Sequence, residues 1–118
     1  MADLTKWWEM PIGEQICNAG SEVARAIRRK NKNDKIGAAE FCIHAIEMLC
    51  YTKLDPKNEK CRNELSYAQE EILDYILGDN LYRNDDQSIM KWYDAFLTER
   101  LYEEKEARRK LESVGETS

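Results

Sequence analysis

The stretch from Ile36 to Lys53 constrains the fold more than any other part of the chain, because apolar residues cover most of its helical circumference. Its polar residues gather on one narrow side of a helical wheel: Glu40, His44, Glu47 and Tyr51. A helix that is apolar on nearly every side is normally buried. The sequence therefore predicts a largely buried central helix, with Ile46 on its core face and the rest of the chain packed around it.

Two further helices are predicted on either side of this stretch. Pro11 suits the first turn of a helix, and apolar residues then recur at three- and four-residue steps, which predicts a helix over Pro11–Lys32. Asp34 is a favourable N-cap for the central helix. Asp55 and Pro56 form the clearest boundary in the chain, because Asp55 can cap a third helix of which Pro56 is the first residue.

A loop is predicted from Gly78 to Asp85, because this segment is rich in turn-forming residues. Gly78 stands where a left-handed C-cap would end the third helix. Leu81 and Tyr82 are the apolar residues of the loop, and we expect them to cover the end of the helical body.

The residues after this loop predict a fourth helix that continues into a charged extension. Asp85 or Asp86 can cap it, and its aromatic-rich face contains Ile89, Trp92, Tyr93, Phe96 and Leu97. Beyond Leu101 nearly every residue is polar or charged, so helix propensity is high but a core stripe is missing. We therefore assign residues 1–101 to a single helical-bundle domain and residues 102–118 to a charged, partly frayed helical tail.

Composition agrees with an all-α protein. The 118 residues include only two prolines and five glycines, and 42% of them are hydrophobic while 35% are charged. Short loops join the predicted helices in sequence order, so successive helices should pack antiparallel. The expected fold is an antiparallel, up-down-up-down four-helix bundle with a charged C-terminal helical extension.

Cysteine usage and hydropathy indicate the cytoplasm. The chain has four cysteines but no Cys-x-x-Cys pair, so neither a zinc ribbon nor a redox motif is predicted. Because the first residues do not form an export signal, we expect these thiols to be free rather than bridged. No apolar run approaches the ~20 residues of a membrane span, so no membrane association is expected.

The single histidine limits the chemistry that this chain can perform. Glu40, His44 and Glu47 share one helix face, but a di-iron bundle needs two Glu-x-x-His pairs on different helices. A Cys–His or Ser–His pair would have to use the same histidine. We therefore expect no catalytic residue, no metal and no cofactor, and an enzyme that uses His44 with Glu40 and Glu47 is a rival hypothesis.

Charge is spread unevenly along a chain whose net charge is −5. Residues 1–53 carry eight Lys/Arg against seven Asp/Glu, a net +1, whereas residues 54–118 carry ten against sixteen, a net −6. A basic stripe lies near the end of the first helix and consists of Arg25, Arg28, Arg29 and Lys32, with Lys35 just beyond. It is either a solvated face that complements the helix dipole or a site for phosphate groups or an acidic partner.

Aromatic residues form the second surface feature. The interior between four small helices needs fewer aromatic residues than the chain supplies: Trp7, Trp8, Tyr82, Trp92, Tyr93, Phe96 and Tyr102. The candidates for contacts outside the core are Trp7, Trp8 and Trp92. These tryptophans either line the edge of the core or form contacts between copies of the chain in an oligomer.

Two blocks of the sequence are IGEQICNAGSEVARAIRRKNK (Ile12–Lys32) and YILGDNLYRNDDQSIMKWYDAF (Tyr75–Phe96). With an Ile-Gly…Gly-Ser-Glu-Val-x-Arg-Ala pattern and a Gly-Asp-Asn-x-Tyr turn, they resemble a family of small uncharacterised prokaryotic helical-bundle proteins. The resemblance implies no activity. It draws attention to Ser21, Glu22, Arg25, Gly78, Asp79, Asn80 and Tyr82, of which Asp79, Asn80 and Tyr82 form a candidate loop site.

From these features we expect a non-enzymatic protein-interaction or assembly module that forms homo-oligomers or joins a larger assembly. The alternative is a nucleic-acid-associated accessory protein that uses the basic stripe Arg25–Lys35. Nucleic acid is the less favoured partner, because the second half of the chain is acidic.

Overall fold

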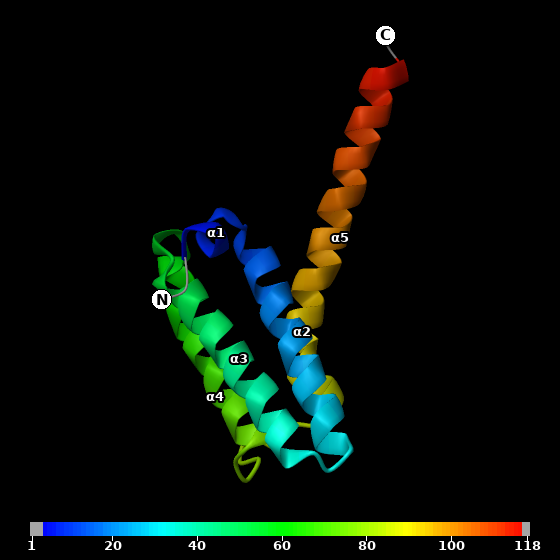
Figure 1. Ribbon diagram of the computed structural model, residues 1–118. Helices are drawn as coiled ribbons and strands as arrows, with labels where there is room; N and C mark the ends of the chain where they lie inside the picture. Colours follow the sequence, from blue (N-terminus) through cyan, green and yellow to red (C-terminus); the bar gives the residue numbers. More distant parts are fainter. Residues whose placement is uncertain (1–3, 117–118) are drawn as a thin grey trace.

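The structure, a computed structural model, describes residues 4–116 apart from the side chains of residues 100, 101 and 113–116. Within the described residues every regular element is a helix (Figure 1), so the predicted all-α class is confirmed. The elements are α1 (Leu4–Glu9), α2 (Ile12–Asn31), α3 (Lys35–Leu54), the 3-10 helix η1 (Pro56–Cys61), α4 (Arg62–Ile76) and α5 (Asp86–Glu116). None of these described helices is both long and apolar enough to cross a membrane.

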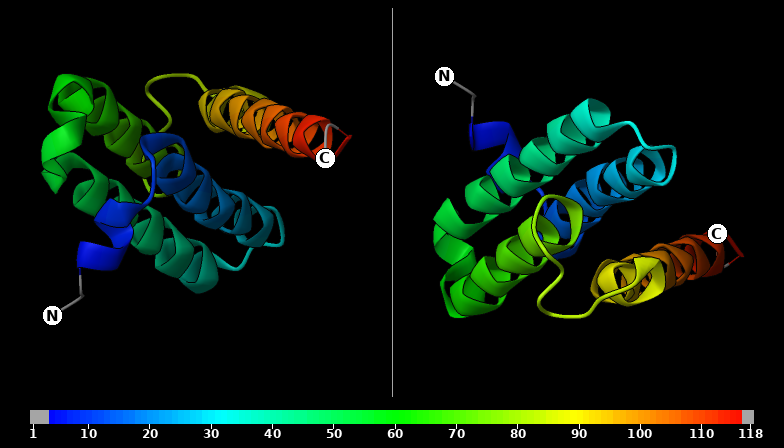
Figure 2. Two further views of the ribbon diagram at one scale, coloured as in Figure 1. Left: turned by 90° about the horizontal axis from the view of Figure 1, so that it is seen from above. Right: turned by 90° about the horizontal axis from the view of Figure 1, so that it is seen from below.

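Helix α2 is in contact with each of the other three long helices, although α4 packs mainly against α3. Helix α2 contacts α3, α4 and α5, whereas α5 rests mainly on α2 and meets α4 at few points. Successive long helices run in opposite directions, and α5 extends far beyond the others (Figure 1). Views from above and below place α2 between α3 and α5, with the loop from α4 arcing across to α5 (Figure 2). Helix α2, rather than the predicted central helix, therefore touches all the other long helices.

The core is built mainly from small and medium apolar side chains, with two residues contributed by α5. Its buried members are Ile16, Ala19, Val23, Ala26, Ile27, Cys42, Ala45, Leu49, Leu65, Ala68, Ile72, Tyr75, Ile89 and Tyr93. Gly20 brings α2 and α5 close together, because a Cβ at this position would lie only 2.9 Å from the Cβ of Tyr93.

Helix α3 is buried on one side only, so the prediction that it is largely buried is wrong. Its core face consists of Ala38, Cys42, Ala45, Leu49 and Thr52. On the opposite side Ile36 is 76% exposed and Ile43 is 49% exposed. Ile46 is half-buried at the edge of the core rather than at its centre. A helix that is apolar on all sides carries no periodic signal to show which side faces inward.

The helix starts agree with the predicted N-caps. Asp34 accepts the backbone N–H of Gly37 at 2.9 Å, and Asp55 accepts a backbone N–H of the next turn at 3.1 Å. At the start of α5, Asp85 and Ser88 each accept the other's backbone N–H at 2.7 Å, which is a reciprocal capping arrangement. The turn that follows Asp55 is the 3-10 helix η1 rather than the predicted α-helix.

The loop between α4 and α5 differs from its prediction. Gly78 has no positive φ; the left-handed residues are Asn80 (φ 54°) and Arg83 (φ 57°). The reason for glycine at position 78 is the lack of space for a side chain. A Cβ there would lie 3.0 Å from the carbonyl oxygen of Asp74. Leu81 is 81% exposed, so it does not cover the end of the helical body as we expected.

A buried polar network joins α1, α2, α3 and η1 at one end of the molecule. Gln15, which is fully buried, donates to Asp55 Oδ2 at 3.0 Å and to the carbonyl oxygen of Trp7 at 2.8 Å. Asn58 donates to Gln15 Oε1 at 2.8 Å and to the carbonyl oxygen of Thr52 at 3.0 Å. Because buried polar groups without partners are costly, these bonds hold α1 and η1 against the longer helices.

The stability of the fold is expected to depend on pH through Asp55. Burial raises the pKa of this carboxyl, but hydrogen bonds from Lys57 and Gln15 and the charge of Lys57 outweigh burial, so the pKa lies below its ordinary value. The carboxylate therefore stabilises the fold above the unfolded-state pKa of about 3.9, and this stabilisation is lost as the pH falls through the folded-state pKa. Asp55→Asn should cost about 1–3 kcal/mol at neutral pH and progressively less below about pH 4.

Urea unfolding at about pH 7, 5 and 3 measures this difference. Asp79→Asn makes the same chemical change in an exposed loop, so it should alter the unfolding free energy little at any pH. If Asp55→Asn cost the same at all three pH values, the charge of Asp55 would contribute nothing to folding.

Helix α5 remains helical through Glu116. Beside the start of α2 it forms a groove of about 390 Å³, whose α5 side reaches from Phe96 to Ala107. Residues of α5 beyond position 101 therefore face the start of α2 across this groove. The domain boundary placed after residue 101 stays a prediction.

Candidate functional site

Four cations of the predicted basic stripe come together on α2. They line a surface hollow of about 310 Å³, which has Phe41 of α3 as its apolar wall and comprises Arg25, Arg28, Arg29 and Lys32. The guanidinium carbon of Arg29 lies 5.9 Å from the centre of the Phe41 ring. Lys35, the fifth predicted member, is exposed at the start of α3 and does not line the hollow.

Carboxylates pair with two of the four cations that line this hollow. Glu22 Oε1 lies 2.6 Å from Arg25 Nη1, and Asp34 Oδ2 lies 3.5 Å from Arg29 Nη1. Within the described residues, Arg28 and Lys32 form no ion pair. Two positive charges thus remain available at the hollow for an anionic group.

His44 interacts with a residue of α2. Glu40 and Glu47, which were predicted on the same helix face as His44, are not its partners. His44 Nδ1 lies 4.0 Å from Glu22 Oε2, and its ring packs edge-on against Phe41 with centroids 6.4 Å apart. Glu40 and Glu47 are exposed. Among the side chains that the structure describes, no three His, Cys, Asp or Glu residues are grouped as metal ligands.

The candidate loop site is organised by Asp74, a residue of α4 that the sequence did not single out. Its carboxylate accepts the N–H of Leu81 at 2.8 Å and the N–H of Tyr82 at 3.0 Å. The Asn80 side chain bonds both the N–H and the carbonyl oxygen of Asn84, at 2.9 and 2.8 Å. Asp79 is exposed. The side chains of Asp74 and Asn80 thus shape the loop itself.

A contact between two tyrosine rings attaches the loop to α4. Tyr82 packs against Tyr67 with centroids 5.5 Å apart, and the Tyr82 hydroxyl donates to Glu70 at 3.2 Å. Tyr82 therefore attaches the loop to the side of α4, although it stays 45% exposed.

The three tryptophans are half-buried, and each indole N–H donates to a group in the chain. Trp7 donates to Thr52 Oγ1 at 3.0 Å, and Trp8 donates to the carbonyl oxygen of Tyr51 at 3.0 Å. Both bonds attach α1 to the end of α3. The Trp92 indole donates to Glu64 Oε1 at 2.7 Å and so links α5 to α4.

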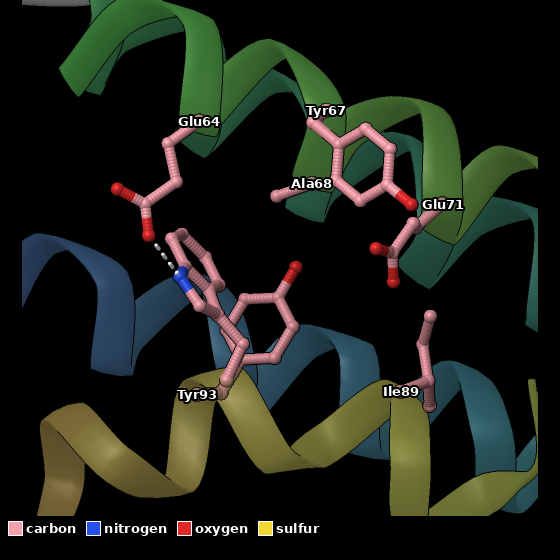
Figure 3. A pocket seen from close by; sticks show the side chains of 7 residues that line it. Glu64, Tyr67, Ala68, Glu71, Ile89 and Tyr93 are labelled. Atoms are coloured by element: carbon pink, nitrogen blue, oxygen red, sulfur yellow. Dashed lines mark hydrogen bonds between the residues drawn. The ribbon is translucent and has the colours of Figure 1, made fainter.

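A cavity of about 200 Å³ opens between α4 and α5, along the line where these two helices meet at few points (Figure 3). The residues that line it are Glu64, Tyr67, Ala68, Glu71, Ile89, Trp92 and Tyr93. Its floor is buried, because Ala68, Ile89 and Tyr93 are at most 8% exposed. Glu64 and Tyr67 are exposed and form its rim.

The floor of this α4–α5 cavity contains a buried polar atom without a partner. The Tyr93 hydroxyl forms no hydrogen bond within the described chain, although Tyr93 is only 4% exposed. It points from α5 toward Tyr67 and Glu71 of α4 (Figure 3). Burial first, and then the charge of Glu71, raise the pKa of Tyr93 well above its ordinary value, so the side chain remains a neutral phenol.

Trp92 and Tyr93 were predicted on the aromatic-rich face of the fourth helix, but no sequence pattern predicted the cavity. Its acidic members, Glu64 and Glu71, are seven residues apart on α4. That spacing puts them on one helix side, but it gives no sign that α5 lies opposite.

Fold and sites together define an all-α protein with a basic hollow on α2 and an acidic, aromatic cavity between α4 and α5. Comparisons of this chain with family models, curated proteins and solved structures found no match. The resemblance of two sequence blocks to small prokaryotic helical-bundle proteins therefore stays a prediction.

Proposed function

We propose that this chain is a non-enzymatic protein-interaction module that self-associates through the outer side of α3. In this proposal α2–α5 form an up-down-up-down four-helix bundle with an open seam between α4 and α5. The protein would act in the cytoplasm, where its four cysteines stay reduced. The observation that carries the proposal is the exposure of Ile36 and Ile43 on α3.

The outer side of α3 has the residue spacing of a helix–helix contact. Ile36, Ile43 and Cys50 are seven residues apart, and Leu54 continues the same side. A seven-residue apolar repeat is typical of a helix that packs along another helix. Leu54 is 54% exposed, and the two isoleucines are exposed as well, so the described chain leaves most of this stripe uncovered.

Helix α4 widens this apolar surface. Gln69 Nε2 donates to the carbonyl oxygen of Ile46 at 2.9 Å, which sets the antiparallel register of α3 and α4. Because the two helices are antiparallel, moving one turn forward along α4 corresponds to moving one turn back along α3. Leu73 of α4 is therefore expected at the level of Ile43 of α3. Leu73 is 48% exposed, and we include it in the proposed surface.

A second copy of the chain is the partner that we propose for this surface. Closed twofold dimers are the commonest assemblies, and they place one surface patch against itself. In an antiparallel α3 pair centred between residues 44 and 45, Ile43 of one copy meets Ile46 of the other. Ala39 then meets Cys50, and these small side chains allow the two helices to approach closely.

Changing Ile36 and Ile43 together to glutamate is expected to convert a dimer into a monomer. Each buried isoleucine contributes about 1.5–3 kcal/mol, so the double change should weaken self-association at least about a hundredfold. Analytical ultracentrifugation over a concentration series measures the effect. Leu97→Glu places one glutamate at an exposed position of α5 and should leave the dimer intact. A wild-type protein that is monomeric at every concentration, or a double variant that still dimerises, would contradict the proposal.

The basic hollow supports the second candidate, a nucleic-acid-associated accessory protein. Phosphate contacts by the two unpaired cations alone would make log K fall with log salt at a slope of about −1.4 for single strands or −1.8 for duplex, and contacts by all four cations at about −2.8 or −3.6. The net charge of −5 opposes the approach of nucleic acid, so we expect weak binding or none. Tight binding with such a slope, lost when the four cations of the hollow are changed to glutamate, would favour this candidate over self-association.

A further inference from the structure

We propose that the cavity between α4 and α5 binds a small organic ammonium ion whose N–H groups bond to Tyr93 and Glu71. This ligand class goes beyond the interaction role proposed above and does not depend on it. Three features of the cavity carry the proposal: its acidic and aromatic lining, the unpartnered hydroxyl in its floor, and its size.

The lining has the composition of a site for an organic cation. Its charged members are Glu64 and Glu71, and its other lining residues include no Lys or Arg. Three aromatic rings stand beside these carboxylates, from Tyr67, Trp92 and Tyr93. Aromatic ring faces attract ammonium groups, and the attraction grows when water is excluded. An anionic ligand would meet two like charges here, so the lining selects against it.

The Tyr93 hydroxyl is the second and independent feature. A buried polar atom without a partner is costly, and native structures usually satisfy such atoms with protein, water or a ligand. Figure 3 shows this hydroxyl directed toward the side chains of Tyr67 and Glu71 across the cavity. An ammonium group placed between them can donate one N–H to the phenol oxygen and another to the carboxylate.

The size of the cavity fits an ammonium group that carries a short alkyl chain. A volume of about 200 Å³ exceeds the space of a single water, whose share of the liquid is about 30 Å³. Ala68 and Ile89 form an apolar part of the wall, which suits the alkyl chain. The same ligand chemistry exists in free amines and in lysine side chains of other proteins, so the test must separate these sources.

The probe that we choose is n-propylammonium chloride, titrated into the labelled full chain and followed by NMR. The Trp92 indole N–H signal is the readout, because this group lies at the rim and bonds to Glu64. We expect saturable shifts with n-propylammonium, and weaker binding of tetramethylammonium because it has no N–H to donate. Neutral n-propanol should bind at least about tenfold more weakly, since it lacks the charge that the carboxylates attract.

Three variants test the assignment to this cavity. Glu71→Gln should weaken n-propylammonium binding at least about tenfold, because it removes a charge-assisted hydrogen bond, and Tyr93→Phe should weaken it several-fold. Glu47→Gln removes an exposed carboxylate from α3 and should leave binding unchanged. Thermal unfolding of each variant shows whether the fold persists. If Tyr93→Phe unfolds the protein, the Glu71→Gln comparison alone decides the result.

The outcomes separate the proposal from its alternatives. Equal binding of n-propanol and n-propylammonium would show an apolar cavity, and shifts that sodium chloride reproduces would show a salt effect; either result overturns the proposal. Binding that survives Glu71→Gln also overturns it. If Nα-acetyl-lysine methylamide binds more tightly than n-propylammonium, the cavity accepts a lysine side chain. The opposite order assigns it to a free amine, and both orders support an ammonium site.

Discussion

Replacing Leu49 with alanine is expected to lower the free energy of unfolding by about 2–5 kcal/mol. Leu49 is fully buried on the core face of α3. Removing most of its side chain leaves a cavity that its neighbours cannot fill, because a protein interior is close-packed. Urea unfolding followed by circular dichroism should show a lower midpoint with an unchanged slope.

Two further variants test whether the loss of stability depends on how deeply the substituted side chain is buried. Leu111→Ala makes the same chemical change at a position of α5 that is 73% exposed, so it should alter stability by about 0.5 kcal/mol or less. Ile46→Ala, at a half-buried position, should fall between them. If Ile46→Ala cost more than Leu49→Ala, the core face of α3 would be centred on Ile46 and the exposure of Ile43 would need another explanation.

The starts of the helices could be predicted because their signals are local. Asp34 and Asp55 each bond a backbone N–H within the next turn, and Asp85 does the same with Ser88. A cap needs only a short polar side chain beside the first helical residues, so the sequence contains all the information. The all-α class followed for a similar reason, since the spacing of apolar residues is a property of single segments.

The orientation of α3 could not be predicted in the same way. Its apolar residues occur on every side, so the residues that face inward are selected by the neighbouring helices. The structure turns the small residues Ala38, Cys42 and Ala45 toward α2 and α4 and leaves Ile36 and Ile43 outside. Small side chains permit a close approach of helices, and Leu49 is the large apolar side chain that this core face also carries.

The buried polar network was missed because its members are far apart in the sequence. Gln15 and Asp55 are separated by 40 positions, and Gln15 and Asn58 by 43. An isolated Gln or Asn in a sequence is normally read as a surface residue. Only the docking of α1 and η1 against the longer helices makes these side chains partners.

The two candidate sites differ in how far apart their residues lie in the sequence. The basic hollow could be predicted, because Arg25, Arg28, Arg29 and Lys32 are three, four and seven positions apart on one helix. Lys35, predicted just beyond these four, does not line the hollow, since it lies at the start of α3. The α4–α5 cavity lies between two helices that meet at few points, so no pattern within either helix predicts it.

Gly20→Ala is expected to destabilise the protein by about 1–3 kcal/mol, although alanine favours helices. The new Cβ would lie 2.9 Å from the Cβ of Tyr93 and 3.1 Å from two of its ring carbons. Tyr93 is buried, so it cannot swing away, and α5 must move off α2 instead. Because Tyr93 also forms the floor of the α4–α5 cavity, the same change should weaken n-propylammonium binding. Urea unfolding and the NMR titration measure the two effects.

Gly13→Ala is the matched control for this prediction, because it adds the same methyl group to the same helix. The nearest atom to a Cβ at Gly13 is Phe96 Cδ1 at 4.0 Å, which is an ordinary contact. With no clash, the main effect is a less flexible unfolded chain, and stability should rise by up to about 1 kcal/mol. The two alanine variants should therefore change stability in opposite directions. If both stabilised the protein equally, the backbones of α2 and α5 would not approach as closely at Gly20 as the structure shows, and Tyr93 would not be held in the cavity floor by this contact.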